Sequence, residues 1–343
     1  MAAARAAHRD GDLQRAGTGY QAVLQSRPDH AEAWHMLGVI AHQQGRNGDA
    51  QQLILHALAL APDTQGAHYN LGTIMLATGK AESAVRHLQA ALPRHPEPAR
   101  AHHKLGDALR LTGKRGPACE HYRKAVELDP GYSEAHYNLG TCLLALQQPD
   151  LAVEHLQRAV ELQPGFALAH GNLGLALRDA GRPVEAEHHL REAARLEPGS
   201  ASARNRLCEF HERGNELQAA WESNAEALRI DPDNSDAQLL RGLLLRRRGN
   251  LRAALATLQF LDPVKLHPEN TVRLQFESGR LHDRLGNSAE AMRCFACGNA
   301  MQADSPAGRS CSPADYVDRV RRMSDLVSAL PPSTWRPQAA EYA

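Results

Sequence analysis

The amino-acid sequence predicts an all-α solenoid built from about nine helix-turn-helix units. Prolines recur every 34 residues, Leu-Gly pairs recur in the same register, and alanine fills a further column. Chance does not hold several columns in register over some 200 residues. The proline column is Pro28, Pro62, Pro96, Pro130, Pro164, Pro198 and Pro232.

The composition fits this fold and limits the function. A chain of 343 residues is long for one globular core, so we expect two domains or one repeating architecture. Aromatic residues make up 4% of the chain, which favours packed helices over β-sandwiches. Lys plus Arg (39) equals Asp plus Glu (39), so no nucleic-acid partner is expected.

The same composition indicates a cellular location. The six cysteines are scattered, which is unlike the framework of a small secreted domain. The amino terminus has no apolar core of signal-peptide length, and no apolar run is long enough to span a membrane. We therefore expect a cytoplasmic protein with no membrane association.

Each 34-residue unit contains two apolar-periodic stretches of about 12 residues, and each predicts a helix. A glycine followed by a polar residue separates the two stretches, as at Gly45, Gly79, Gly113 and Gly181. Glycine there can end a helix with a positive φ at little cost, and the proline of the lattice ends the second helix. A second glycine column lies inside the first helices and needs a packing reason, which we expect to be the close approach of two helices. This column is Gly38, Gly72, Gly106, Gly140, Gly174 and Gly242.

The unit 31–64 carries Trp34, Leu37, Gly38, Ala50, Ile54, Ala57 and Pro62 at the motif positions of a known repeat. On these residues the chain resembles the tetratricopeptide repeat family over about 300 residues. The resemblance implies a right-handed superhelical solenoid with a concave groove, and a function in binding other proteins.

The repeats divide the chain into a solenoid over 1–305 and a tail over 306–343. A partial unit occupies 1–30, regular units fill 31–234, a degenerate unit covers 235–271, and a last unit follows at 272–305. In the degenerate unit Arg241 replaces a leucine, which predicts softness and fast hydrogen exchange, and extra residues enter around 262–270. Apolar residues spaced by 3 and 4 predict a capping helix at 313–330.

The sixth position of each first helix predicts a peptide-binding face. By resemblance to the family it lines the concave groove, and an asparagine there can bond both polar groups of a peptide backbone. The column resembles the asparagine ladder of O-linked N-acetylglucosamine transferase, with interruptions. The alternative is a plain solvated face. The column reads Met36, Asn70, Lys104, Asn138, Asn172, Arg206 and Leu240.

Arginines gather toward the C-terminal half of the predicted groove. We expect them to bind an acidic, extended ligand through charge-assisted bonds, or else to pair with Asp179, Glu209 and Glu212. The arginines are Arg178, Arg206, Arg213, Arg246, Arg247, Arg280 and Arg284. The predicted peptide-binding residues are therefore Asn70, Lys104, Asn138, Asn172, Arg178, Arg206 and Arg213.

Two histidine columns lie at positions 4 and 23 of the units. Neighbouring members of one column are too far apart to share a metal ion, although the two histidines of one unit could meet. Packing and surface roles are favoured over metal binding or pH sensing. The pairs are His68 with His87, His102 with His121, His136 with His155, and His170 with His189.

No other motif predicts chemistry. Cys294-x-x-Cys297, with Cys311 and His282, lacks the second pair that marks a zinc site. The Gly-x6-Gly-Lys runs have the wrong spacing for a phosphate loop, and no GxSxG, HExxH or GxGxxG occurs. We therefore expect no catalytic residue, no metal and no cofactor.

The segment from Gly279 through Phe295 and Ala300, with the helix 313–330, resembles a junction in bacterial proteins that fuse these repeats to a sulfotransferase. Two functions remain open. The chain is either an interaction scaffold that binds a protein or peptide, or the substrate-recruiting region of such an enzyme, whose phosphate-binding loop is missing from this chain.

Overall fold

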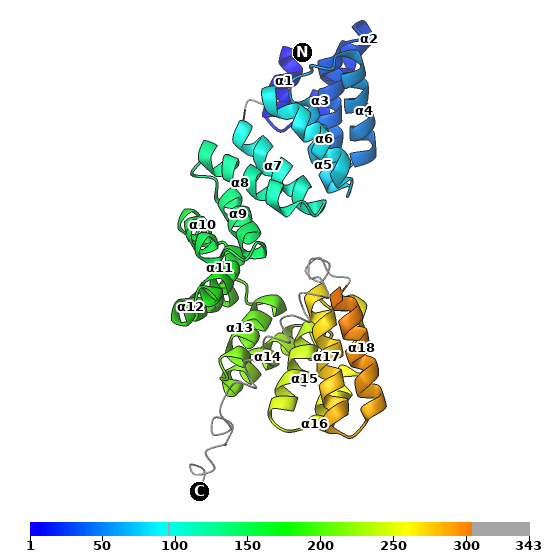
Figure 1. Ribbon diagram of the computed structural model, residues 1–343. Helices are drawn as coiled ribbons and strands as arrows, with labels where there is room; N and C mark the ends of the chain where they lie inside the picture. The colour runs from blue at the N-terminus through cyan, green and yellow to red at the C-terminus, as the bar shows by residue number, and fades with distance from the viewer. Residues whose placement is uncertain (95–96, 304–343) are drawn as a thin grey trace, which may run out of the picture. The chain divides into compact units, whose positions relative to one another are not determined.

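We describe the fold from a computed structural model, which covers residues 1–94 and 97–303. Within these ranges the chain forms 18 α-helices and two short 3-10 helices, and no strand (Figure 1). The predicted all-α repeat fold is therefore confirmed. The chain divides into two compact units, Met1–Pro198 and Gly199–Ala343, and the predicted capping helix at 313–330 lies outside the described residues.

The first unit contains six helix pairs, joined by tight turns and stacked in chain order. Its elements are α1 (Ala2–Arg9), α2 (Leu13–Ser26), α3 (Ala31–Gln43), α4 (Asn47–Leu60), α5 (Ala67–Ala77), α6 (Ala81–Ala91), η1 (Leu92–Arg94), α7 (Pro98–Leu111), α8 (Arg115–Leu128), α9 (Ser133–Ala145), α10 (Pro149–Leu162), α11 (Ala167–Asp179) and α12 (Pro183–Leu196).

The second unit contributes three further pairs among the described residues. The division between the units comes at a boundary between regular repeats, and not at the irregular joint near 262–270. Its elements are α13 (Ala201–Arg213), α14 (Leu217–Ile230), α15 (Ser235–Arg247), α16 (Leu251–Leu258), η2 (Pro263–Lys265), α17 (Pro268–Arg284) and α18 (Ser288–Ala303).

The glycine column inside the first helices marks a close crossing of the two helices of each pair. A Cβ added at Gly72 would lie 2.6 Å from Cγ of Leu88, and one at Gly106 would lie 2.6 Å from the ring of Tyr122. The partner in each case stands 16 residues later, on the second helix. The alanine column is fully buried from Ala16 to Ala254, so small side chains on both helices allow their backbones to approach.

The turn glycines adopt the conformation that the sequence predicts, with φ of 77° at Gly45 and 75° at Gly181. In the repeat 133–166 this position is held by Gln147, which takes φ of 59° without being glycine. The turn geometry is therefore imposed by the packing of the repeat, because a glutamine does not favour a left-handed backbone.

Two second helices are shorter than the 14 residues of their regular counterparts. Helix α6 ends at Ala91 because Pro93 precedes the lattice proline and cannot continue a helix. Helix α16 ends at Leu258, and the extra residues predicted around 262–270 form η2 and its flanks. This segment exposes Phe260 and Val264, which are 83% and 90% accessible.

Arg241, where the sequence predicted local softness, makes specific contacts with its neighbours. The Arg241 guanidinium lies 3.9 Å from the ring centre of Trp221, and Arg248 lies 4.1 Å from the same ring. Arg241 Nε also donates to Oδ1 of Asn224 at 2.7 Å, while the fully buried Asn224 donates to the Ala237 carbonyl. Cation–π contacts and a buried hydrogen bond thus replace the apolar contacts of a leucine. Faster hydrogen exchange in α15 stays a prediction.

Restoring the consensus leucine at Arg241 is therefore expected to destabilise the second unit. Arg241→Leu leaves Oδ1 of Asn224 buried without its donor, which costs about 1–3 kcal/mol. Urea unfolding compares it with the double variant Arg241→Leu, Asn224→Leu, which removes both polar groups and is expected to recover most of the loss. An Arg241→Leu protein that is more stable than wild type would show that the polar contacts contribute little.

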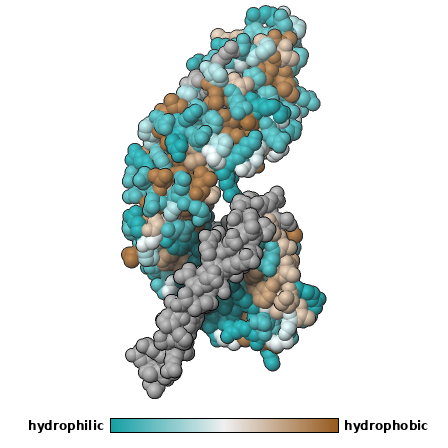
Figure 2. Space-filling model, in the orientation of Figure 1, coloured by the Kyte–Doolittle hydropathy of each residue, from teal (hydrophilic) through white to brown (hydrophobic). Residues whose placement is uncertain are grey.

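The face drawn in Figure 2 is largely hydrophilic, with hydrophobic residues in separate patches. Among the described helices, none is both long enough and apolar enough to cross a membrane.

Candidate functional site

The position-6 face of the first unit consists of Met36, Asn70, Lys104, Asn138 and Asn172, one from each first helix between α3 and α11. Met36 and Asn70 line a hollow of about 660 Å³ that is walled by α1, α3 and α5. An adjoining hollow of about 600 Å³ shares Met36 with it. Met36 and Asn70 therefore border open space at this end of the unit.

The three ladder asparagines bond to the preceding repeat. Nδ2 of Asn70 lies 2.8 Å from Nε2 of His35, and Nδ2 of Asn138 lies 2.7 Å from Nε2 of His103. Asn172 donates to the hydroxyl of Thr141 at 2.9 Å. An amide hydrogen of each asparagine that the ladder prediction reserved for a ligand is thus used between repeats. Asn172 is buried, whereas Asn70 and Asn138 are half-buried, and their Oδ1 atoms can accept a peptide N–H.

The histidine acceptors of this ladder must be neutral. An amide can donate to Nε2 only when that nitrogen carries no proton. Burial lowers the pKa of His35 to about 4 and also lowers the pKa of His103, which keeps both rings neutral near pH 7. His103 Nδ1 then donates to the Tyr132 hydroxyl at 3.0 Å.

Asp107 accepts hydrogen bonds from three side chains in the middle of this face, and no pattern in the sequence pointed to it. Its carboxylate accepts from the Tyr122 hydroxyl at 2.9 Å, from Asn138 at 3.2 Å and from Lys104 at 3.3 Å. Lys104 therefore belongs to an ion pair within the repeat, with 33% of its side chain accessible. Tyr122 and Lys104 belong to the same repeat as Asp107, whereas Asn138 comes from the next one. The stacking of consecutive repeats therefore completes this cluster.

Two buried polar atoms beside the 600 Å³ hollow have no hydrogen-bond partner within the described chain. They are the hydroxyl of Tyr20, whose residue is fully buried, and Nδ1 of His8. Arg5 and Arg9 line the same hollow, and Arg5 is paired with Glu32. Buried polar groups in native proteins are nearly always satisfied, so this hollow is suited to a polar, acidic group.

The predicted arginines have different surroundings. In the first unit Arg178 pairs with Asp179 at 2.7 Å, as the alternative of paired surface charge expected. In the second unit Arg206 and Arg213 both lie on α13, Arg206 half-buried and Arg213 exposed. They remain candidates for contacting a ligand.

Three of the other predicted arginines of the second unit bind buried carboxylates, whereas Arg284 is exposed near the end of α17. Arg247 lies 2.9 Å from Glu212, and Arg246 and Arg280 lie 2.8 and 2.6 Å from Glu277. Glu212 and Glu277 are only 4% and 5% accessible. These arginines are held in the packing of α13, α15 and α17.

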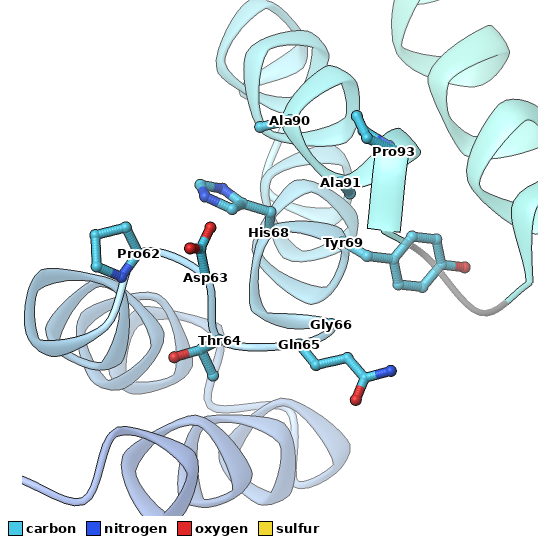
Figure 3. Close-up of a pocket in the computed structure, with 10 residues that line it drawn as sticks. All are labelled: Pro62, Asp63, Thr64, Gln65, Gly66, His68, Tyr69, Ala90, Ala91 and Pro93. Carbon is cyan, nitrogen blue, oxygen red and sulfur yellow. The ribbon is translucent and has the colours of Figure 1, made fainter.

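The structure also brings together the two histidines of each of the four repeats that carry a predicted pair. In the first of these pairs Nδ1 of His68 lies 3.0 Å from Nδ1 of His87. His68 borders a pocket of about 350 Å³ next to Asp63, while Tyr69 points to its other side (Figure 3).

The predicted cysteine set is only partly described. Cys294 is half-buried and Cys297 is exposed on α18, whereas Cys311 lies outside the described residues. Nδ1 of His282 lies 3.4 Å from Nδ2 of Asn287, at the turn between α17 and α18. Burial raises the pKa of the Cys294 thiol, which makes it a weaker nucleophile at neutral pH.

Comparisons with known families match most of the first 235 residues. Models of the tetratricopeptide repeat match residues 7–65, 65–90, 133–166 and 172–235, and a TPR repeat model matches 106–147. No curated protein matches the sequence.

Solved structures support the same fold. A tetratricopeptide repeat protein from Parabacteroides merdae is 16% identical with a TM-score of 0.60, covering 73% of this chain and 98% of its own. PilF of Pseudomonas aeruginosa is 19% identical with a TM-score of 0.53, covering 63% of this chain and 98% of its own.

Proposed function

Since this chain is a tetratricopeptide repeat protein, we propose that it is a protein-binding scaffold that holds an extended peptide along the position-6 face. Repeats of this family form rigid, extended surfaces on which exposed polar groups bind partners. The observation that carries the proposal is the pair of adjoining hollows lined by Met36, with Asn70 at their edge.

The peptide backbone would bond to the asparagines. Asn70 and Asn138 are half-buried and have already given Nδ2 hydrogens to the preceding repeat, so Oδ1 would accept peptide N–H groups at a spacing set by the repeat. The hydrogen bonds from Nδ2 to the preceding repeat hold each side-chain amide in one orientation. Oδ1 is therefore already positioned, and peptide binding needs little further ordering of the side chain.

An acidic group of the ligand would bind at two places. In the first unit, the Tyr20 hydroxyl can donate to a carboxylate beside Arg5 and Arg9. In the second unit, Arg206 and Arg213 would contact acidic side chains. Arg178, which is 21% accessible and already paired with Asp179, would contribute less than the sequence indicated.

Removing Asn70 and Asn138 is expected to weaken peptide binding about tenfold for each asparagine, since a lost hydrogen bond of about 1–1.5 kcal/mol has that effect. Peptides enriched on the wild type from a displayed library of unstructured sequences are measured by fluorescence polarisation against Asn70→Ala, Asn138→Ala and the double variant. Arg123→Ala, an exposed change on α8, is the matched control.

Because Asn138 also bonds His103, the thermal stability of each variant is measured beside its affinity. Equal affinity of wild type and the double variant, at equal folded fraction, would remove the ladder from the proposal. Charge reversal at Arg206 and Arg213 tests the acidic ligand separately, since unchanged affinity and salt dependence would exclude that part alone.

The second candidate function is substrate recruitment for a sulfotransferase. Its support is the junction-like sequence from Gly279 through Phe295, which lies on α17 and α18. We propose no catalytic activity for the residues of this chain. Sequencing the gene beyond the codon for Ala343 tests this function, because it requires the reading frame to continue into a phosphate-binding loop.

A further inference from the structure

Four consecutive repeats of the first unit each place two imidazoles nitrogen to nitrogen. In every case one histidine comes from the first helix of the repeat and the other from the second helix. The Nδ1–Nδ1 distances are 3.0 Å for His68 and His87, 2.9 Å for His102 and His121, 3.2 Å for His136 and His155, and 3.0 Å for His170 and His189.

The tautomers of one pair follow from its other contacts. Nε2 of His170 lies 3.1 Å from the carbonyl of Pro164 and donates to it, so the neutral ring has a lone pair on Nδ1. His189 must then donate its Nδ1 hydrogen to that lone pair. This pair therefore holds two unprotonated nitrogens, one on each ring, and no charge.

Burial lowers the pKa of most of the paired histidines, namely His87, His102, His121, His136, His155, His170 and His189. A neutral imidazole is the form that binds a metal ion, so this shift favours the binding form.

The separation of the rings is close to that of two ligands of one ion. Bonds of about 2.0–2.1 Å at the tetrahedral angle place two nitrogens ~3.4 Å apart. The observed pairs need to open by only a few tenths of an ångström. The donor ring would move its hydrogen from Nδ1 to Nε2, which needs no net loss of a proton.

At least one pair can be reached from solvent. His68 borders the 350 Å³ pocket of Figure 3, and the carboxylate of Asp63 lines the same pocket. Water can complete the coordination of an ion held by two imidazoles. Of the other six histidines, His136 and His170 are buried and the remaining four are half-buried.

We infer that each of the four histidine pairs is a chelating site for one divalent ion of borderline softness, such as Zn²⁺ or Ni²⁺. The plain alternative is that the N–H···N hydrogen bond is the only role of the pair. Both readings explain the short distance, and they differ in whether a metal ion displaces the shared hydrogen.

The test is calorimetric titration of the full chain with Ni²⁺ and with Zn²⁺ at slightly alkaline pH. Cys294, Cys297 and Cys311 are first replaced by serine, because their thiolates would compete for the ions. Four ions per chain are expected to bind, one for each pair. His87→Gln should lose one of them, and its combination with His121→Gln, His155→Gln and His189→Gln should lose all four.

The exposed His56 supplies the control, because its ring contacts Trp34 and no second imidazole. His56→Gln should keep the full number of ions. The substitutions are made on the second helix to spare the position-4 histidines, one of which bonds the lattice proline carbonyl. Absence of binding to wild type, or equal binding to wild type and the four-histidine variant when both are folded, would overturn the inference.

Discussion

Lowering the pH from about 7 to about 5 is expected to destabilise the first unit, Met1–Pro198, much more than the second. The histidines whose pKa is lowered all lie in the first unit. In the unfolded chain these groups take up protons near pH 6.5, while the folded unit resists protonation. Their contribution to stability is therefore complete above pH 6.5 and is lost as the pH falls toward the folded pKa.

His35 sets the scale of this effect. Burial lowers its pKa from 6.5 to about 4, so its contribution is lost across that interval. At pH 5 the loss from His35 alone is about 2 kcal/mol. The half-exposed histidine pairs add smaller amounts each, because solvent screens them. Carboxylates with lowered pKa values, such as Glu185 and Glu192, stay ionised at pH 5 and do not contribute.

Hydrogen exchange by mass spectrometry measures this prediction, because it resolves peptides of the two units separately. The urea midpoint of peptides from the first unit should fall between pH 7 and pH 5, with little change in the second. The His35→Leu variant should lose part of that pH dependence, and His56→Gln should not. A first unit whose midpoint is the same at both pH values would show that its histidines titrate normally when folded.

Replacing Glu212 by alanine is expected to cost the second unit about 2–4 kcal/mol, since removing one partner of a buried ion pair leaves the others uncompensated. One carboxylate oxygen of Glu212 lies 2.9 Å from Arg247 and the other lies 3.4 Å from Arg273. Only 5% of the Glu212 side chain is accessible, whereas Arg247 is 36% accessible and can reach water. The loss of unfolding free energy in Glu212→Ala should therefore be smaller than the largest losses found when one partner of a fully buried ion pair is removed.

Urea unfolding of the second unit checks this value. Glu212→Gln keeps the shape of the side chain and removes its charge, so it should lie between alanine and wild type. The control is Glu222→Ala on the exposed face of α14, where surface substitutions change stability by about 0.5 kcal/mol or less. If Glu212→Ala and Glu222→Ala have equal effects, the carboxylate does not hold α13, α15 and α17 together.

The Glu212 variant also separates stability from ligand binding. Because Arg247 and Arg273 are engaged by Glu212, an acidic ligand would have to compete with an intramolecular partner there. Arg213 is exposed on α13 and does not face this competition. We therefore expect charge reversal at Arg213 to affect binding more than charge reversal at Arg247, which would mainly affect stability.

The sequence by itself determined the repeat and its core. The 34-residue spacing predicted the helix pairs, the positive φ of Gly45 and the close helix crossing at Gly72, all confirmed by the structure. These features follow from residues within one repeat, where helical periodicity and backbone preferences act over short distances. The extra residues after α16 could also be predicted, because they interrupt the 34-residue spacing.

Only the tertiary structure decided which polar side chains meet. Asn70 bonds His35 and Asn138 bonds His103, in each case 35 residues away, because neighbouring repeats stack with a particular rise and rotation. The His68–His87 contact depends likewise on the crossing of two helices. A sequence column records which residues share a position, but side-chain contacts within hydrogen-bonding distance depend on how the helices are rotated against one another, and packing of the whole unit sets that rotation.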